Sequence, residues 1–156
     1  MKRRVGTVIV LLSLGLSGCG PSVSVSTEVK QEIKESDTMN INVNGQVASV
    51  QLEDNATVKA ILAEMPFTIQ MDDLHQNEKY YYFDKSFPAN PQPIQTIEAG
   101  DVLLYQNNCL VIFYQAAEPI VPYTRIGKIS RFQEIQASFG NQSVSVQWYE
   151  GEGRQL

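Results

Sequence analysis

Short apolar runs, most of which alternate with polar residues, are separated by turn-forming residues, and this pattern restricts the fold of the chain most. About eight such runs occur in the 156 residues, at 39–43, 46–52, 67–71, 79–83, 102–105, 109–114, 123–129 and 144–148. A period of two residues is typical of β-strands, and many short strands without a strand–helix–strand rhythm favour a closed barrel. We therefore predict a mainly β fold, a closed antiparallel β-barrel of about eight strands with two short helices capping its ends.

The first two runs give the clearest local prediction. Asn44-Gly45 stands between them and supplies the positive φ angles of a type I′ turn, so the runs are expected to form a β-hairpin. Val47, Val50 and Leu52 are the apolar members of its second strand. The later runs at 102–105 and 109–114 are continuously apolar, which is typical of strands buried on both faces.

Two stretches have a helical pattern. In the first, Asp54 or Asn55 can cap a helix that continues through Glu64, with one apolar stripe formed by Val58, Ile61, Leu62 and Met65. The second opens with Ser130 and Gln133, a capping-box pattern, and carries Phe132, Ile135 and Phe139 before Gly140. We expect helices at both places.

The start of the chain has the pattern of an export signal. Three basic residues at 2–4 precede an apolar run of about 12 residues, too short to cross the ~30 Å core of a bilayer. The run ends in LSGC, which resembles a bacterial lipobox, and this resemblance implies lipid attachment at Cys19. We predict a lipoprotein signal peptide at 1–18, a lipid-anchored flexible linker at 19–37, the barrel at 38–150 and a tail at 151–156. The protein would be extracytoplasmic and held at a bacterial cell membrane or envelope. The sequence does not distinguish the inner from the outer membrane.

Charge and composition exclude several functions. Removal of residues 1–18 leaves 9 basic and 17 acidic side chains, so the net charge becomes −8 instead of −5. A nucleic-acid binder needs an excess of Lys and Arg, so no nucleic-acid partner is expected. Two cysteines and one histidine cannot supply the usual four-ligand Cys/His zinc site, and we predict no metal and no cofactor. If Cys19 carries lipid, Cys109 has no disulfide partner, and its apolar surroundings indicate a buried free thiol.

Several stretches resemble the cyclophilin barrel. Ile126-Gly127-Lys128-Ile129 and Phe139-Gly140 stand where cyclophilins carry Phe-Gly-Lys-Val and Phe-Gly. DDLHQNEKYYYF at 72–83, GDVLLYQNNCLVIFY at 100–114 and YTRIGKI at 123–129 are similar to the small bacterial cyclophilin-like fold proteins, and the likeness extends over about residues 39–149. It implies a cyclophilin-like barrel for nearly the whole domain.

The resemblance does not extend to the residues that make a prolyl isomerase. Those enzymes have a Phe-His-Arg strand followed by Phe-Met-x-Gln-Gly-Gly, whereas residues 66–83 contain no arginine and no Gln-Gly-Gly. The only basic side chains in residues 66–83 are His75 and Lys79. The position that matches the pocket histidine of the isomerases is near Tyr123. Arg125 is the one arginine well inside the domain that could substitute for the missing one. We expect no catalytic residues of the usual isomerase type.

The candidate ligand-binding residues are Tyr80, Tyr82, Tyr105, Tyr123 and Arg125. Alternation along YYYF at 80–83 directs two rings to the core and two outward, where they could stack on a ligand. The simpler interpretation is that the two inward rings belong to the barrel core and the two outward rings to the sheet surface, with no ligand. Arg125 could clamp a carboxylate, or pair with Asp101 or Glu98. Asp72, Asp73 and His75 are interpreted as residues of a polar turn at 72–77.

The sequence thus predicts a lipid-anchored, non-enzymatic binding module. Its ligand would be a peptide segment, a small molecule or a partner protein, held between the strand at 80–83 and the strands of Tyr105 and Tyr123–Arg125. Two alternatives stay open at this point. One is a divergent peptidyl-prolyl cis–trans isomerase that uses Arg125, and the other is an accessory subunit of an envelope complex.

Overall fold

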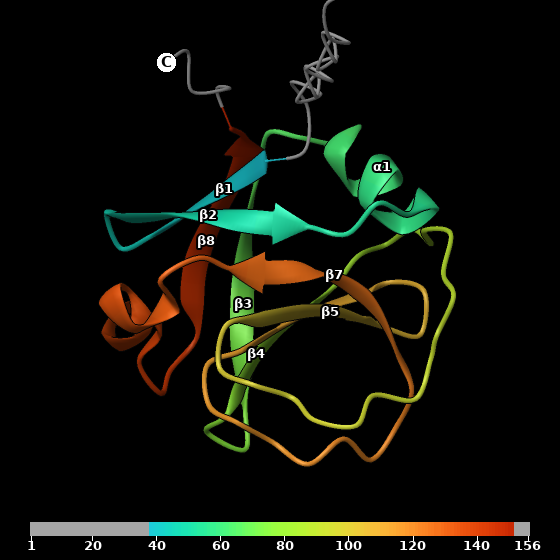
Figure 1. Ribbon diagram of the computed structural model, residues 1–156. Coiled ribbons are helices and arrows are strands. Elements are labelled where there is room, and N and C mark those ends of the chain that lie inside the picture. The colour runs from blue at the N-terminus through green and yellow to red at the C-terminus, as the bar shows by residue number, and fades with distance from the viewer. Residues whose placement is uncertain (1–37, 152–156) are drawn as a thin grey trace, which may run out of the picture. The chain divides into compact units, whose positions relative to one another are not determined.

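The computed structural model describes residues 38–151 (Figure 1). The predicted signal peptide, Cys19, the linker and nearly all of the tail lie outside these residues. The described part has eight strands and one short α-helix, with two 3₁₀ turns before the last strand. The strands are β1 (Thr38–Val43), β2 (Gln46–Leu52), β3 (Phe67–Leu74), β4 (Glu78–Tyr82), β5 (Asp101–Tyr105), β6 (Cys109–Phe113), β7 (Tyr123–Ile129) and β8 (Val144–Glu150).

The strands close into an antiparallel barrel. Their order around it is β1-β2-β7-β5-β6-β4-β3-β8, and β8 pairs with β1 to complete the ring. The first and last strands of the domain are therefore neighbours, with Met39 opposite Glu150. This arrangement confirms the predicted fold class, because all eight strands pair on both sides and the sheet has no free edge.

The β1–β2 hairpin forms as predicted, and the apolar residues of its second strand lie on two faces. Asn44 and Gly45 have φ angles of 52° and 83°, as a type I′ turn requires. Ala48 and Val50 point into the barrel, whereas Val47 is 55% exposed. Val47 differs from Val50 by an odd number of residues, so a strand cannot turn both side chains to the same face.

The first predicted helix is present and slightly shorter than expected. Helix α1 (Ala56–Leu62) begins after Asn55, whose side-chain oxygen accepts a hydrogen bond from the backbone N–H of Val58 at 2.9 Å. Val58 and Ile61 are buried against the barrel interior. The cap and the apolar stripe thus place α1 over one end of the barrel (Figure 1).

The second predicted helix is wrong in type. In its place are the 3₁₀ turns η1 (Phe132–Glu134) and η2 (Gln136–Phe139), and no side chain caps either one. The backbone N–H of Ser130 bonds to Ser49 in β2, and Arg131 adopts a left-handed φ of 50°. The capping box cannot form, because the backbone N–H of Ser130, which the Gln133 side chain would accept from, is already bonded to the neighbouring strand. The predicted apolar residues Phe132, Ile135 and Phe139 are nevertheless buried.

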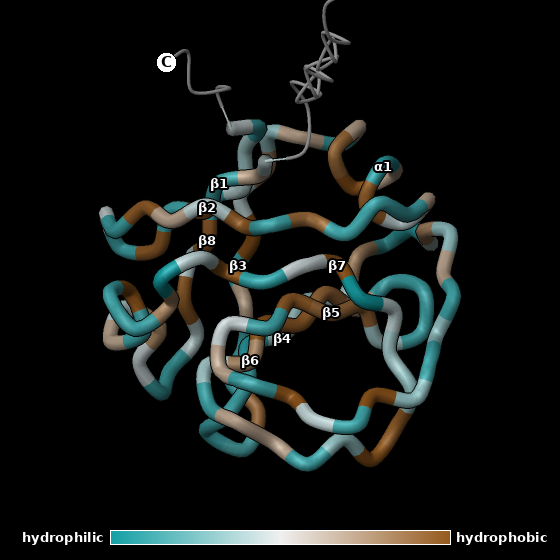
Figure 2. Tube along the Cα trace, in the orientation of Figure 1, coloured by the Kyte–Doolittle hydropathy of each residue, from teal (hydrophilic) through white to brown (hydrophobic). Residues whose placement is uncertain are grey.

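Two hydrophobic clusters stabilise the domain. The inner cluster fills the barrel, and the outer cluster lies on the outer face of β4, β5, β6 and β7. Two long connections, 83–100 and 114–122, pass side by side over that outer face and meet at the bridge between Ile97 and Ala117 (Figure 1). Strands β5 and β6 are consequently buried on both faces, as predicted, and Figure 2 shows the middle of β5 as apolar.

Candidate functional site

Strand β4 divides its aromatic side chains between the two faces of the barrel. Tyr81 and Phe83 pack on the inner cluster, with ring centroids 5.0 Å apart. Tyr80 and Tyr82 point outward, with centroids 5.9 Å apart, and Tyr82 is 50% exposed. The alternation seen in the sequence therefore places two rings where a ligand can reach them.

The outward tyrosines line a groove across four strands. Tyr80 and Tyr82 come from β4, Tyr105 from β5 and Tyr123 from β7, and the groove has a volume of about 410 Å³. Tyr105 and Tyr123 are register partners with ring centroids 6.0 Å apart. We call this site the tyrosine groove; its remaining lining residues are Leu74, His75, Asn77, Glu78, Cys109, Val111, Phe113, Ala117, Glu118, Ile120 and Val121.

The tyrosine groove also gathers most of the large exposed apolar side chains of the described residues. Within residues 38–151, four large hydrophobic side chains are strongly exposed, and three of them, Leu74, Tyr82 and Ile120, line the groove. Ile120 is 89% exposed on the connection between β6 and β7. Single exposed apolar residues are ordinary on protein surfaces, but their convergence on a concave site is typical of a binding surface.

Burial keeps the thiol and the phenols of the groove neutral. Burial raises the pKa of the Cys109 thiol to about 11 and that of Tyr123 to about 12. The neighbouring Cys109 and burial together raise the pKa of Tyr82. At neutral pH the groove therefore offers a thiol and phenols, and no thiolate nucleophile is available for covalent catalysis.

Glu78 is a groove residue that the sequence analysis missed. It begins β4 and lies on the same face as Tyr80 and Tyr82, because side chains two residues apart on a strand share a face. It is half-buried, and burial raises the pKa of its carboxyl group. The signal that could have found it is this alternation, which runs back from the tyrosines to the acidic residue.

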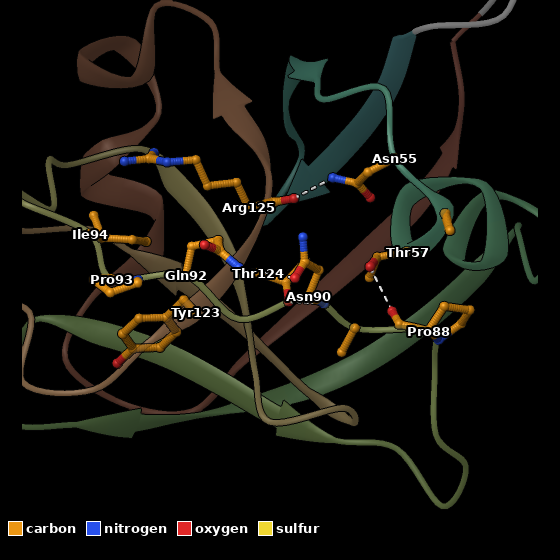
Figure 3. A pocket seen from close by; sticks show the side chains of 12 residues that line it. Asn55, Thr57, Pro88, Asn90, Gln92, Pro93, Ile94, Tyr123, Thr124 and Arg125 are labelled. Atoms are coloured by element: carbon orange, nitrogen blue, oxygen red, sulfur yellow. Dashed lines mark hydrogen bonds between the residues drawn. The ribbon is translucent and has the colours of Figure 1, made fainter.

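Arg125 does not line the tyrosine groove. It lines a neighbouring cavity of about 420 Å³, whose walls come from α1, the segment 88–94 and β7 (Figure 3). In Figure 3 its guanidinium points away from Asn55 and Thr57. Tyr123 lines both sites. The structure thus brings together the predicted tyrosines but leaves the predicted arginine in the adjoining cavity.

The polar groups of that neighbouring cavity bond mainly to one another. The side-chain amide of Asn55 donates to the backbone carbonyl of Arg125 at 2.8 Å, and the hydroxyl of Thr57 donates to the backbone carbonyl of Pro88 at 2.6 Å. The Thr124 hydroxyl accepts from the backbone N–H of Asn90 at 2.9 Å. The bonds of Thr57 and Thr124 attach the segment 88–93 to α1 and β7, so these polar groups have a structural role.

The predicted ion pair of Arg125 with Asp101 or Glu98 is wrong. Lys128 takes both partners: its ammonium bonds to Glu98 and lies 3.7 Å from Asp101. Lys128 lies directly opposite Asp101 in the β5–β7 pair, whereas Arg125 lies opposite Leu103. The register of the two strands therefore decides which cation meets the acidic residues.

The acidic pair Asp72-Asp73 lies in β3, which continues to Leu74, so the predicted turn at 72–77 is shorter than expected. Asp73 does cap the turn, since its side chain accepts from the N–H of Gln76 at 3.1 Å. Asp72 accepts from the Ser143 hydroxyl at 2.7 Å. His75 is exposed in the turn. In the described part of the chain, no group of three His, Cys, Asp or Glu side chains is placed to hold a metal ion.

The chain is similar to a known protein family and, at low sequence identity, to solved structures. The sequence profile of the cyclophilin-like family matches residues 41–149. The solution structure of the hypothetical protein AF2241 from Archaeoglobus fulgidus is similar over 78% of this chain and 99% of that one, with a TM-score of 0.52 and 17% identity. McbB, whose structure is in complex with tryptophan, is similar over 76% of this chain but 46% of its own, with a TM-score of 0.55 and 14% identity. Comparison with curated proteins found no match.

Proposed function

The chain belongs to the cyclophilin-like family, and from this premise we propose that its barrel is a binding module whose ligand occupies the tyrosine groove. The observation that carries the proposal is the convergence of Leu74, Tyr82 and Ile120, all exposed, on a groove walled by three further tyrosines. A ligand there would cover apolar surface that water now contacts, which is favourable at about 25 cal/mol per Å² of apolar area.

Prolyl isomerisation is the function that we consider less well supported. An isomerase needs a cation that engages the prolyl amide as it rotates. The hairpin of β3 and β4 carries no arginine, and its only lysine, Lys79, is fully buried. Arg125, the alternative cation, lines the adjoining cavity and not the groove. A divergent isomerase would therefore have to use a site other than the one the tyrosines form.

We further propose that the barrel is tethered at a bacterial envelope through lipid on Cys19. The support is the sequence of residues 1–19, which lie outside the described part of the chain. Between residues 38 and 151, no helix is long and apolar enough to span a bilayer. Metabolic labelling with an alkyne fatty acid tests the tether: the wild-type chain should incorporate the label and Cys19→Ala should not.

The binding role is tested with the neutral apolar dye Nile red and a chain that begins at Thr38. We expect its fluorescence to rise on binding, and Ile120→Ser or Tyr82→Ser to remove most of the increase. Val47→Ser is the matched control, because Val47 is also a strongly exposed apolar residue but lies outside the groove. Equal losses in Ile120→Ser and Val47→Ser would contradict the groove as the binding site.

The same proteins should be assayed for cis–trans exchange of an Ala-Pro peptide. We expect the uncatalysed rate. If the protein accelerates the exchange and Arg125→Ala abolishes the acceleration, the result would support the isomerase and contradict the non-enzymatic binding module.

A further inference from the structure

One groove residue has a charge that the protein itself does not neutralise. The Glu78 carboxylate is half-buried, and within residues 38–151 it takes part in no ion pair and no side-chain hydrogen bond. Other acidic residues of the barrel do have cationic partners: Asp73 binds Lys79, Glu64 binds Lys85, and Glu98 binds Lys128. A carboxylate that is partly withdrawn from water without a partner is costly, and a positively charged ligand would offset that cost.

The cation nearest to Glu78 in sequence cannot serve as its partner. Lys79 points to the opposite face of β4, into the barrel, where its ammonium lies 2.6 Å from Asp73 and donates to the carbonyl of Gln142 at 2.7 Å. His75, in the turn before β4, acts on Glu78 through its charge but forms no ion pair with it. Within the described residues, no basic side chain therefore forms an ion pair with this acidic group of the groove.

The aromatic rings beside Glu78 suit the same kind of ligand. The electron-rich face of a tyrosine ring attracts a cation within about 6 Å of its centroid. Tyr80 follows Glu78 on the same face of β4, with the Tyr82 ring centroid 5.9 Å beyond it. The charge of Glu78 also contributes to the raised pKa of Tyr123, so the carboxylate acts across the groove. Rings and carboxylate together make the groove favourable for positive charge.

We propose that the tyrosine groove binds a small molecule in which a positively charged nitrogen is attached to an apolar or aromatic body. The nitrogen lies between Glu78 and the Tyr80–Tyr82 pair, and the body contacts Leu74 and Ile120. The volume of about 410 Å³ falls in the range of ~300–1,000 Å³ that is typical of small-molecule sites. This inference rests on the proposed function, because it assigns a ligand class to the same groove.

Surface plasmon resonance on the immobilised full chain can test the charge requirement. The probes are phenethylamine, its neutral analogue 2-phenylethanol and the anion 3-phenylpropionate, which have similar aromatic bodies. We expect the amine to bind about tenfold more tightly than the alcohol, which corresponds to about 1.4 kcal/mol, and the anion to bind least. Glu78→Gln should reduce the affinity for the amine to that for the alcohol.

Two controls separate this effect from loss of structure and from a general change of charge. Glu150→Gln removes one acidic charge from the exposed end of β8 and should keep the preference for the amine. Unchanged binding of 2-phenylethanol to Glu78→Gln shows that the groove is intact. Tyr82→Phe should retain the amine affinity and Tyr82→Leu should lower it about threefold, because leucine keeps apolar bulk but has no aromatic face.

The outcomes distinguish this inference from the function on which it rests. Equal affinities for amine and alcohol, or an amine preference that survives Glu78→Gln, would overturn the ligand class and leave the groove as a binding site. Binding of neither compound, together with no Nile red signal that depends on Ile120, would overturn both. Binding of a capped lysine-containing peptide without binding of phenethylamine would overturn the assignment to a small molecule.

Discussion

The ammonium of Lys79 and the carboxylate of Asp73 lie 2.6 Å apart, and the two residues are opposite each other in the β3–β4 pair. The Lys79 side chain is fully buried and its nitrogen also lies 4.9 Å from the centroid of the Tyr114 ring. The Tyr114 hydroxyl donates to the same carboxylate oxygen of Asp73 at 2.7 Å. A charged cluster thus crosses from the surface turn of the hairpin into the inner core.

Removal of the cation should destabilise the barrel strongly. Lys79→Met leaves Asp73 without its counter-ion, and breaking a buried pair in this way costs roughly 3–5 kcal/mol; the low end is expected because the Asp73 side chain is 14% exposed. The double variant Lys79→Met/Asp73→Asn should recover at least about 1 kcal/mol relative to the sum of the single effects. Urea unfolding measures the free energy of unfolding of the two single variants and the double variant. Strictly additive losses would mean that the two charges do not stabilise each other.

The same cluster predicts a loss of stability in acid. Burial alone would raise the pKa of Asp73, but the hydrogen bonds from Lys79 and Tyr114 and the charge of Lys79 outweigh it and lower that pKa. The unfolded chain therefore binds the proton more readily than the folded one, and the contribution of Asp73, complete above about pH 5, disappears as the pH falls through its folded pKa. Urea midpoints between pH 7 and pH 2 should fall more steeply for the wild type than for Asp73→Asn. Parallel curves would contradict this role for Asp73.

Local patterns predicted most of the fold because strand alternation and turn residues act over a few positions. The Asn44-Gly45 turn and the Asn55 cap form as the sequence indicates, since each depends only on its immediate neighbours. The capping box at Ser130 is also a local pattern, but the backbone N–H of Ser130 donates a hydrogen bond to the carbonyl of Ser49 in β2. Pairing with a distant strand decided that segment, and no short-range pattern contains that information.

Gly127 shows how closely two strands of the barrel approach. A methyl group at this position would lie 2.1 Å from the backbone carbonyl oxygen of Gln51 in β2, so β2 and β7 would have to separate. Gly127→Ala should therefore lower the free energy of unfolding by about 2 kcal/mol or more, an overpacking effect. Gln147→Ala, at an exposed position of β8, should change it by less than about 0.5 kcal/mol. Thermal unfolding of the two variants compares them, and equal stability would contradict the close approach.

The candidate site was only partly predictable for a related reason. Alternation identifies Tyr80 and Tyr82 as outward-facing, but the neighbours of β4 depend on the strand order β4-β6-β5-β7, which local patterns do not encode. That order brings Tyr105 and Tyr123 to the same groove. Two residues further along β7, Arg125 belongs to a different cavity, because the segment 88–93 is attached there. The burial of Lys79 was missed for the same reason, since its partner Asp73 was assigned to a turn.

Cys109 should be chemically inert although it lies at the base of the groove. With a pKa of about 11, roughly one thiol in a thousand is ionised at pH 8, against about one in four for an ordinary cysteine. In a Cys19→Ser background Cys109 is the only thiol, and its reaction with iodoacetamide can be followed by mass spectrometry. We expect labelling of the folded protein to be several hundredfold slower than in 8 M urea and to accelerate with each unit of rising pH. Rapid labelling at neutral pH would mean that the groove holds a thiolate, and covalent chemistry at Cys109 would then replace simple binding as the function to be tested.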